Sequence, residues 1–308
     1  MRRAALAITA AACGSPIPPP SITQPAQPAV RLDYEGHRGC RGLRPENTIG
    51  AFERAIELGV DTLELDVMLT ADDVLVVHHD EHLNPDITRD GSAWLAQPGP
   101  ALRTLTFDAL ERYDVGRIAP GTAYAARFAD QLGGDGVRIP KLVDVIADAE
   151  RRSAGRIRYN IEIKTTPGKP DDTAPPDRVA DAIVATAREL GVLDRVTIQS
   201  FDWRGLRRVA AIAPNVPRSC LTEARIPDAA WTDGLAIGSD VPALVAQFGC
   251  QIWSPDYTAL TRAKVAEAHA LHLRVLPWTV DDHDAIVRVI ALGVDGVITD
   301  FPDRLPPR

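Results

Sequence analysis

The chain has 308 residues, of which 45% are hydrophobic and 25% charged, and its formal net charge is -8 at pH 7. This composition is that of an ordinary folded protein, and it excludes a disordered or fibrous chain. Because the net charge is negative, no broad basic field is present to hold a nucleic-acid backbone, and nucleic acid is excluded as a partner.

The N-terminal sequence MRRAALAITAAAC has the pattern of an export signal. Two arginines precede a run of small and apolar residues that is too short to span a bilayer as a helix. The ending Ala-Ala-Ala-Cys resembles a bacterial lipoprotein cleavage box, although Ala10 stands where leucine is usual. We expect residues 1–13 to be a signal peptide and the protein to be exported to the periplasm or cell envelope. Either Cys13 carries a lipid anchor, the only membrane attachment expected, or ordinary cleavage follows an Ala-x-Ala site.

Residues 14–30 form a proline-rich stretch that predicts a stiff, extended tether. The folded domain is expected over residues 31–308, where no segment is apolar enough for a membrane span.

The four cysteines, at positions 13, 40, 220 and 250, show no CxxC motif and no metal-ligand spacing. Cys220 and Cys250 are either paired in a disulfide or two buried free thiols, because spacing alone does not establish the geometry of a bridge.

From residue 33 onward, short β-rich runs alternate with amphipathic patterns of helical period. The helical patterns include TIGAFERAIELG, KLVDVIADAERR, RVADAIVATAREL, TRAKVAEAHALH and DAIVRVIALG. The runs that predict strands are Asp33–His37, Thr62–Leu69, Val74–His79, Arg158–Ile163, Val196–Ser200, Pro217–Leu221, Gln251–Ser254, Arg274–Thr279 and Gly296–Thr299. This alternation predicts an α/β fold, and the number of strands favours a closed (β/α)8 TIM barrel over an open doubly wound sheet.

One connection is too short for a parallel crossover. Only residues 71–73 separate LELDVMLT from VLVVHHD, whereas a crossover needs about a dozen residues. We therefore expect an early β-hairpin, which would bring Asp66 opposite His78 and His79. Residues 84–137 then predict an irregular excursion with a helix at LTFDALERYDVG, placed to cover the substrate site.

Two strand patterns carry carboxylates on one face. Glu64 and Asp66 lie two residues apart in TLELDVML and share a face, opposite apolar residues, and Glu162 and Lys164 do so in YNIEIK. Glu64, Asp66 and Glu162 would form an oxygen-rich site for one hard divalent ion, because adjacent buried carboxylates repel each other. Lys164 would suit an anionic substrate oxygen. A solvated strand face and a surface Glu–Lys pair are the alternatives.

The segments EGHRGC and VVHHD place His37 and His79 at the ends of predicted strands. Imidazoles beside carboxylates and a metal ion suit general acid and base catalysis at neutral pH, whereas a histidine-rich metal site would favour zinc. Arg38 suits a phosphate oxygen. Gly36 and Gly39 are typical of backbone that approaches a ligand closely.

The loop after these residues ends in PENT, which predicts a helix start capped by Asn47 or Thr48. The N–H groups of that helix start attract anions, although a plain helix start explains the motif equally well. Arg41 and Arg44 make the loop basic; they either widen the surface that attracts an anion or are solvated surface residues, and we favour the second interpretation.

The motifs HRG, PENT with AFERAIELGVD, ELDVMLTADD, VVHHD, IEIK, QSFD, PWTV and DGVITDFPD occur in this order. In sequence and order they resemble those of the glycerophosphodiester phosphodiesterases, from residue 33 to residue 305. The resemblance implies a TIM barrel with its site at the C-terminal ends of the strands.

The resemblance also implies roles for individual residues. The implied assignments are His37 and His79 as catalytic acid and base, Arg38 and Lys164 as phosphate ligands, and Glu64, Asp66 and Glu162 as ligands of one Mg2+ or Ca2+ ion. Trp278 would line the pocket for the glycerol or alcohol group, with Phe201 packed beside it. His78 points to the face opposite His79 and receives no role.

The implied reaction is metal-dependent hydrolysis of a small-molecule glycerophosphodiester, such as glycerophosphocholine or glycerophosphoethanolamine, to glycerol 3-phosphate and an alcohol. One histidine would deprotonate a glycerol hydroxyl that attacks phosphorus, and the other would protonate the departing alcohol, before water opens the cyclic phosphate. The alternatives are a lysophospholipid-directed phosphodiesterase of phospholipase D type and a non-catalytic lipoprotein that binds a phosphate ester. The sequence selects neither the metal, the head group nor the oligomeric state.

Overall fold

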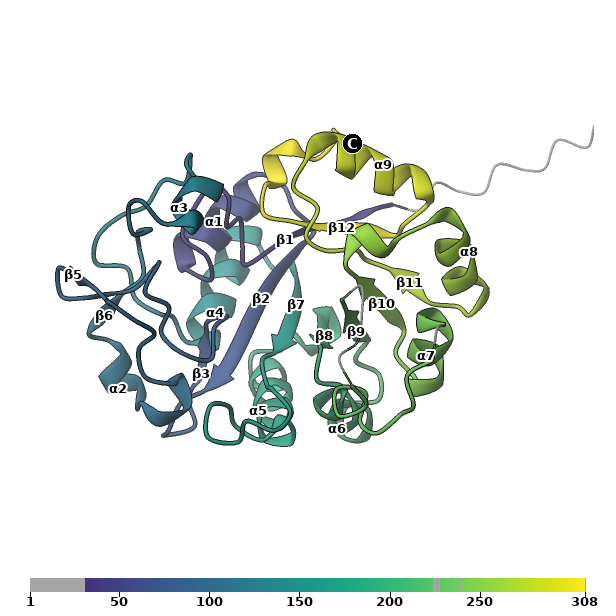
Figure 1. Ribbon diagram of the computed structural model, residues 1–308, viewed down its shortest axis with the longest axis horizontal. Helices are drawn as coiled ribbons and strands as arrows, with labels where there is room; N and C mark the ends of the chain where they lie inside the picture. Colours follow the sequence, from purple (N-terminus) through teal and green to yellow (C-terminus); the bar gives the residue numbers. More distant parts are fainter. Residues whose placement is uncertain (1–30, 224–225, 227, 239, 308) are drawn as a thin grey trace, which may run out of the picture. The chain divides into compact units, whose positions relative to one another are not determined.

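Parallel strands form the wall of a barrel in the computed structural model (Figure 1), which describes residues 31–223, 226, 228–238 and 240–307. The expected signal peptide over residues 1–13, with Cys13, and the expected tether over residues 14–30 lie outside the described residues. The described fold belongs to the unit Leu32–Arg308.

The barrel strands are joined in the order β11-β10-β9-β8-β7-β2-β1-β12, and each neighbouring pair is parallel. Their bounds are β1 (Asp33–Gly36), β2 (Thr62–Leu69), β7 (Arg158–Ile163), β8 (Val196–Ser200), β9 (Arg218–Thr222), β10 (Ile252–Pro255), β11 (Arg274–Val275) and β12 (Gly296–Thr299). Backbone hydrogen bonds from Ile298 N to Pro277 O and from Val280 N to Ile298 O, each 3.0 Å, join the two ends of this path. The predicted (β/α)8 barrel is therefore confirmed, and the open doubly wound sheet is excluded.

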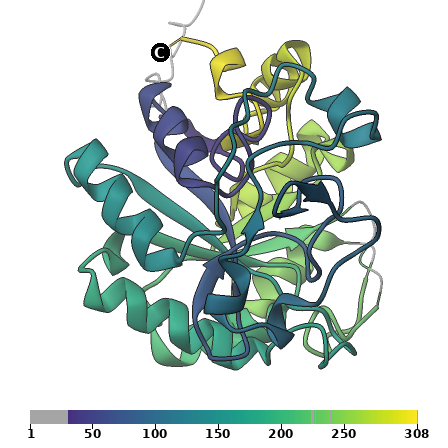
Figure 2. The same ribbon diagram turned by 90° about the vertical axis from the view of Figure 1, so that its left-hand side faces the viewer.

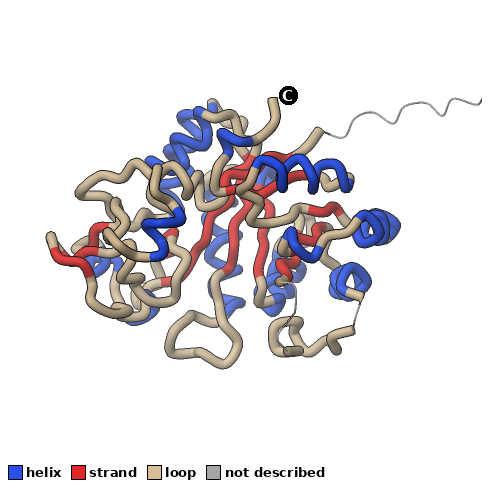
Figure 3. The backbone as a smooth tube through the Cα atoms, turned by 45° about the horizontal axis from the view of Figure 1, so that its top comes forward, coloured by secondary structure: helices blue, strands red, loops and turns tan. Residues whose placement is uncertain are grey.

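Helices follow the strands and cover the outside of the barrel, as Figures 1 and 3 show. The larger ones are α1 (Ile49–Glu57), α4 (Leu142–Ser153), α5 (Pro176–Glu189), α6 (Trp203–Ile212), α7 (Val241–Phe248), α8 (Arg262–Ala270) and α9 (His283–Leu292). Short 3-10 turns are η1 (Leu102–Thr104), η2 (Leu193–Arg195), η3 (Tyr257–Ala259) and η4 (Pro302–Arg304). Side-chain caps begin several helices, since Asp202, Asp240 and Asp282 accept backbone N–H bonds from the first turns of α6, α7 and α9. Among the described residues, no helix has the length and apolar character needed to cross a membrane.

The apolar core lies between the strands and the helices. Leu63, Leu65 and Val67 of β2 are fully buried in it, together with Phe52 of α1 and Ile146 of α4. Each such side chain contributes about 1.5–3 kcal/mol by leaving water. Because side chains alternate along a strand, this outward apolar face fixes the intervening carboxylates of β2 inside the barrel.

A disulfide joins Cys220 of β9 to Cys250, which lies just before β10. The pairing that the sequence left open is therefore present, and Cys40 is a buried free thiol.

The early hairpin is confirmed. β3 (Leu75–Val77) pairs antiparallel with β2, with Val67 opposite Val77 and Leu69 opposite Leu75. His78 N donates to Asp66 O at 3.0 Å, so the segment that carries the two histidines does lie opposite Asp66.

Residues 84–137, the excursion, contain more regular structure than expected. They form a small antiparallel sheet of β4 (Arg89–Asp90), β5 (Ala93–Trp94) and β6 (Tyr113–Asp114), which faces the viewer in Figure 2 together with α2 (Phe107–Leu110) and α3 (Ala123–Arg127). The prediction of one helix over LTFDALERYDVG is wrong after Leu110, where α2 ends. The chain forms β6 from Tyr113 onward. A separate apolar cluster holds the excursion together, formed by Met68, Val76, Leu83, Leu102, Leu110, Tyr113, Val115 and Ile139.

The predicted strand Arg274–Thr279 is shorter in the structure and ends at Val275. Pro277 has no N–H to donate and interrupts the ladder. The chain nevertheless continues beside β10, since Trp278 N donates to Pro255 O at 3.0 Å. Trp278 therefore still reaches the C-terminal end of the barrel.

Glu35 of β1 is a buried carboxyl group inside the barrel, 2% exposed, and it accepts a hydrogen bond from Asn160 Nδ2 at 2.8 Å. Burial, reinforced by the charge of Asp33, raises the pKa of Glu35 from 4.5 to about 8. The folded chain thus keeps this proton between pH 4.5 and pH 8, where the unfolded chain releases it. Since the folded state binds more protons in this window, Glu35 makes the protein less stable as the pH rises through it.

We expect Glu35→Gln, which mimics the protonated side chain, to raise Tm at pH 8 by about 5 °C or more and to change it little near pH 4.5. Glu57→Gln, at a side chain that is 59% exposed, is the matched control and should shift Tm equally at both pH values. Thermal melting followed by circular dichroism measures both variants. An equal shift of Tm for Glu35→Gln at the two pH values would contradict the assigned burial of a neutral Glu35.

Candidate active site

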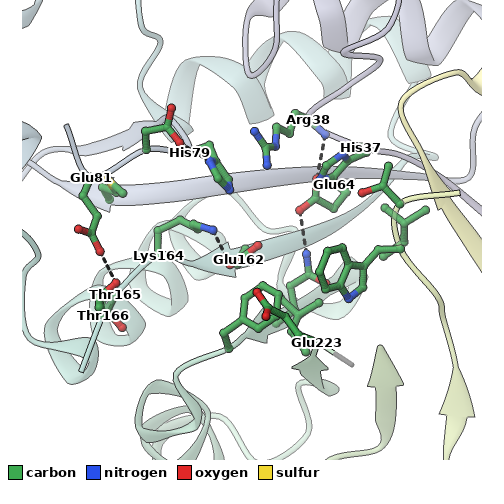
Figure 4. Close-up of a pocket in the computed structure, with 18 of the residues that line it drawn as sticks. His37, Arg38, Glu64, His79, Glu81, Glu162, Lys164, Thr165, Thr166 and Glu223 are labelled. Atoms are coloured by element: carbon green, nitrogen blue, oxygen red, sulfur yellow. Dashed lines mark hydrogen bonds and ion pairs between the residues drawn. The ribbon is translucent and has the colours of Figure 1, made fainter. Parts of the chain in front are cut away.

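A cavity of about 1020 Å³ opens at the C-terminal ends of the barrel strands (Figure 4). Of the residues that the sequence singled out, those that line it are His37, Arg38, Arg41, Glu64, His79, Glu162, Lys164, Phe201 and Trp278. Asp66 is fully buried beside them. The structure therefore brings all of the predicted site residues to one place, at the end of the barrel where TIM-barrel enzymes hold their active sites.

The three predicted metal ligands converge because of strand register. β2 and β7 are paired so that Asp66 lies beside Glu162, and Glu64 shares the inward face of Asp66. One oxygen from each carboxylate lies within 4.8 Å of the others. Asp66 Oδ1 is buried without a hydrogen bond, and Lys164 Nζ is 3.8 Å from it. A buried oxygen triad with an unsatisfied acceptor fits a hard divalent cation.

The electrostatics of the triad point the same way. Burial, together with the charges of Asp66 and Glu162, raises the pKa of Glu64 well above its usual value. Burial likewise raises the pKa of Glu162 to about 7, against the opposing effect of Lys164. For Asp66, burial is outweighed by Arg38 and other nearby cationic groups, which hold its pKa far below the ordinary range. Without a cation, ionising all three buried carboxyl groups costs free energy, because their charges repel each other. A divalent ion would therefore stabilise the fully charged triad.

Arg38 lies two residues after the end of β1 and contacts the carboxylates. Its backbone N donates to Glu64 Oε2 at 2.8 Å, and its Nη1 donates to Glu46 Oε1 at 2.8 Å. The Nε atom lies 3.3 Å from Asp66 Oδ2. Arg38 has a φ of 49°, a left-handed conformation that costs energy for a residue with a Cβ and is typical of functional sites.

Lys164 lies at the end of β7 and completes the positive side of the cavity. Its Nζ donates to Glu162 Oε1 at 2.9 Å and lies 5.9 Å from the centroid of the Phe201 ring. Lys164 and Arg38 both line the cavity. An anionic group in the cavity would thus have a fixed positive charge on each of two strand ends.

His37 is held by its Nδ1 atom, which is 2.6 Å from Asp300 Oδ1. Its Nε2 atom lies 3.9 Å from Glu64 Oε2. Burial lowers the pKa of His37 to about 4, even though Asp300 opposes this change. In the protein without substrate, the ring is therefore neutral at neutral pH.

His79, which follows β3, has a parallel arrangement. Its Nδ1 atom is 2.6 Å from Asp80 Oδ1, and Asn84 Nδ2 donates to Asp80 Oδ2 at 2.7 Å. Burial and then the charge of Arg38 lower the pKa of His79 to about 4. The neighbouring His78 is buried and does not line the cavity, in agreement with its exclusion from the predicted site.

The PENT motif serves both the helix and the site. Thr48 caps α1, since its side chain accepts from Ala51 N at 3.3 Å. Asn47 instead donates through Nδ2 to Asp66 Oδ2 at 2.8 Å, and its Oδ1 accepts from Asp66 N at 3.3 Å. Thr48 is thus the cap, and Asn47 orients a carboxylate of the triad.

Two interpretations of the loop after β1 are wrong. Arg41 is 6% exposed rather than solvated, because its guanidinium makes two hydrogen bonds to Asp300. Arg44 is partly exposed, and its Nη1 donates to Leu132 O at 3.3 Å, so its interpretation as a surface residue is not contradicted. Gly39 has a φ of 83°, and a Cβ there would lie 2.7 Å from the carbonyl carbon of Ala51. Its close approach is therefore to α1 and not to a ligand.

The predicted aromatic wall is present. The rings of Trp278 and Phe201 meet edge to face with centroids 5.3 Å apart, and Trp278 Nε1 donates to Ser254 O at 2.9 Å. Asn84 and Arg127 of the excursion also line the cavity, as the expected cover would.

Four residues at the site were not identified from the sequence. They are Glu46, Asn47 in its contact with Asp66, Gln199, whose Nε2 donates to Glu64 Oε1 at 2.8 Å, and Asp300. All four belong to the motifs PENT, QSFD and DGVITDFPD. The available signal was the position of Gln199 near the end of β8 and of Asp300 just after β12, and the place of Glu46 and Asn47 in the loop that leads into α1.

A closed parallel barrel with histidines, cations and an acidic triad at its C-terminal end defines a TIM-barrel enzyme for an anionic substrate. A family model described as "Glycerophosphoryl diester phosphodiesterase family" matches residues 37–304. The chain belongs to the glycerophosphodiester phosphodiesterase family, and it is a phosphoric diester hydrolase.

Individual relatives agree with this assignment. The glycerophosphodiester phosphodiesterase of Caldanaerobacter subterraneus subsp. tengcongensis is 31% identical over 276 residues, which are 87% of this chain and 94% of the relative. A Silicibacter pomeroyi protein assigned to the glycerophosphoryl diester phosphodiesterases has a crystal structure that matches with a TM-score of 0.82 and 35% identity, over 90% of this chain and 92% of that one. An Oleispira antarctica phosphodiesterase, solved with its product sn-glycerol-3-phosphate, shares the fold with a TM-score of 0.67 and 20% identity, over 89% and 94% of the two chains.

The acidic triad predicts a metal-dependent stability. Mg2+ or Ca2+ at about 100 times its dissociation constant should stabilise the protein by about 2.7 kcal/mol. Glu162→Gln removes one charge and keeps an acceptor for Lys164, so we expect metal-free Tm to fall by no more than about 1 °C and the metal-induced rise to vanish.

Thermal melting with and without each ion, after treatment with a chelator, measures this effect. Glu223→Gln is the matched control, because Glu223 lines the cavity outside the triad and its loss should leave the metal response unchanged. A full metal response in Glu162→Gln, or none in the unmodified protein, would contradict the metal site.

Proposed function

We propose that this enzyme hydrolyses glycerophosphodiesters, such as glycerophosphocholine or glycerophosphoethanolamine, to glycerol 3-phosphate and an alcohol. In this proposal the reaction depends on one divalent ion, Mg2+ or Ca2+, and on acid and base catalysis by His37 and His79. The main support is that both imidazoles border the cavity that also contains Arg38 and Lys164. These are the groups that proton transfer at a phosphodiester requires.

The orientation of the histidines suits their proposed roles. Each ring has its Nδ1 atom 2.6 Å from a carboxylate, of Asp300 or of Asp80, so Nε2 is the atom left for the substrate. A neutral ring can accept the proton of a glycerol hydroxyl. A bound phosphodiester anion would raise the pKa of a nearby imidazole, so the other ring can carry the proton that the departing alcohol needs.

The remaining groups of the site would stabilise the negative charge on the phosphoryl oxygens. Arg38 and Lys164 would donate hydrogen bonds to the non-bridging oxygens and stabilise the negative charge that grows on them during attack. A divalent ion held by Glu64, Asp66 and Glu162 would supply further positive charge at a phosphoryl oxygen.

The proposed reaction has two steps and no covalent enzyme intermediate. The deprotonated glycerol hydroxyl attacks phosphorus, and the bond to the alcohol breaks as that oxygen takes the proton from the second histidine. Water then opens the cyclic phosphate with the two histidines in exchanged roles, and both return to their starting states.

The experiment that tests the function is a hydrolysis assay on chelator-treated protein refilled with Mg2+ or Ca2+. Glycerophosphocholine and glycerophosphoethanolamine should yield glycerol 3-phosphate with either ion restored and none without metal. Release of choline from lysophosphatidylcholine alone would replace the proposal by a lysophospholipid-directed phosphodiesterase. Binding of glycerophosphocholine without hydrolysis would indicate a phosphate-ester-binding protein.

In the same assay, His37→Ala and His79→Ala should each lower kcat by about 10²- to 10⁴-fold, the usual contribution of a general acid or base. Folding should be intact, because neither ring belongs to the apolar core. His78→Ala is the control for a buried histidine outside the cavity and should retain most of kcat in folded protein. Turnover near that of the unmodified enzyme in either catalytic variant would remove that histidine from the mechanism.

We also propose that the protein is exported, with residues 1–13 as its signal and Cys13 as the site of a possible lipid. The Cys220–Cys250 disulfide supports an oxidising compartment. The mass of the N-terminal peptide of the mature protein distinguishes a lipid-modified Cys13 from ordinary cleavage, and an intact Met1 would contradict export by this signal.

A further inference from the structure

We propose that Asp300 is a positioning residue for His37 and that Arg41 holds Asp300 in its working orientation. The inference rests on the proposed role of His37 as acid or base and names what fixes the reacting atom of that ring. Asp300 does not line the cavity, so its effect reaches the substrate through His37, whereas Arg41 both lines the cavity and holds Asp300.

Both oxygens of Asp300 are occupied by this arrangement. Oδ1 is 2.6 Å from His37 Nδ1 and accepts from Arg41 Nε at 2.9 Å, and Oδ2 accepts from Arg41 Nη2 at 2.8 Å. Asp300 is fully buried, and Arg41 is buried as well. The guanidinium fork and the carboxylate thus form a two-point contact that leaves the carboxylate one orientation.

The backbone fixes the same carboxylate. Asp300 directly follows β12, its N–H donates to Asp281 Oδ1 at 2.9 Å, and its carbonyl accepts from Gly42 N at 2.9 Å. The loop after β1 and the end of β12 are therefore joined by Arg41 and by the main chain. His37 belongs to that loop, and its own N–H donates to Thr299 O at 2.8 Å.

This geometry selects the tautomer of His37. A carboxylate paired with arginine only accepts hydrogen bonds, so the short contact to Asp300 requires the proton on Nδ1. In the neutral ring, Nε2 then carries the lone pair and faces the side of Glu64, 3.9 Å away. Without Asp300 the proton could move to Nε2, and the ring could rotate away from the substrate.

The two histidines differ in how their carboxylates are held. Asp80, which contacts His79, has a side chain that is 32% exposed and accepts from Asn84, an uncharged amide. Asp300 instead has the buried guanidinium of Arg41. A second arginine, Arg127 of α3, reaches Asp300 Oδ2 only at 3.4 Å, and its side chain is 54% exposed. Arg127 therefore contacts the same carboxylate without enclosing it.

Asp300→Asn tests the proposal, because the amide keeps the shape and can donate to Nδ1. We expect kcat for glycerophosphocholine to fall by about 10²- to 10⁴-fold while KM changes by less than about threefold. Arg41→Lys should lower kcat by a smaller factor, because it keeps the charge and loses the fork. Arg54→Gln, at an exposed ion pair with Glu57 outside the cavity, is the control and should keep kcat within about threefold of the unmodified enzyme.

Histidine nitrogen NMR of the full chain supplies a readout that a merely structural role would not change. With His37→Gln used to assign the signal, the unmodified protein should show the His37 proton on Nδ1, and Asp300→Asn should shift it to Nε2. Unchanged kcat in folded Asp300→Asn, or a proton on Nε2 in the unmodified protein, would overturn the proposal. If Asp300→Asn does not fold, Arg41→Lys and the NMR of the unmodified protein decide it.

Failure of the proposed function is a separate result. A protein that turned over no glycerophosphodiester would refute that function, whereas the NMR experiment would still report whether Asp300 fixes the His37 ring.

Discussion

The site depends on the crowding of three carboxylates inside a closed barrel. Glu64, Asp66 and Glu162 share one buried space because two inward positions of β2 meet one of β7, and the outward apolar residues prevent any other placement. Like charges at this distance in a poorly solvated interior raise each other's cost of ionisation. Positive charge must therefore gather around them, and Arg38 and Lys164 supply part of it.

The need for positive charge beside the acidic triad also explains the conformation of the loop after β1. The backbone of Arg38 adopts a left-handed conformation. In this conformation its N–H donates to Glu64 and its guanidinium donates to Glu46. Tyr124 of the excursion also donates to Glu46, which ties the cover of the site to the guanidinium that borders the cavity. A phosphodiester that enters this cavity meets cations already held in place, and such preorganised charge favours the transition state over the free substrate.

The sequence could predict the barrel and the acidic triad because both follow from short-range periodicity. The two-residue spacing of Glu64 and Asp66 and the short link before β3 were sufficient for their placement. The partners of Arg41 could not be predicted in this way, since Asp300 lies 259 residues further along the chain. The two-residue strands β4, β5 and β6 could not be predicted either, because so short a segment has no alternating pattern of apolar and polar residues. The roles of the two histidines were suggested by their place at predicted strand ends beside carboxylates, and the resemblance to a family assigned them.

The most direct test of the account is a crystal structure of the protein with Mn2+ and glycerol 3-phosphate, with the ion located by its anomalous scattering. The account predicts one ion bonded to Glu64, Asp66 and Glu162, and phosphate oxygens in contact with Arg38 and Lys164. The Nε2 atoms of both histidines should lie within hydrogen-bond reach of the ligand, at about 2.6–3.2 Å. An ion bound away from the triad, or a phosphate beyond the reach of either ring, would contradict it.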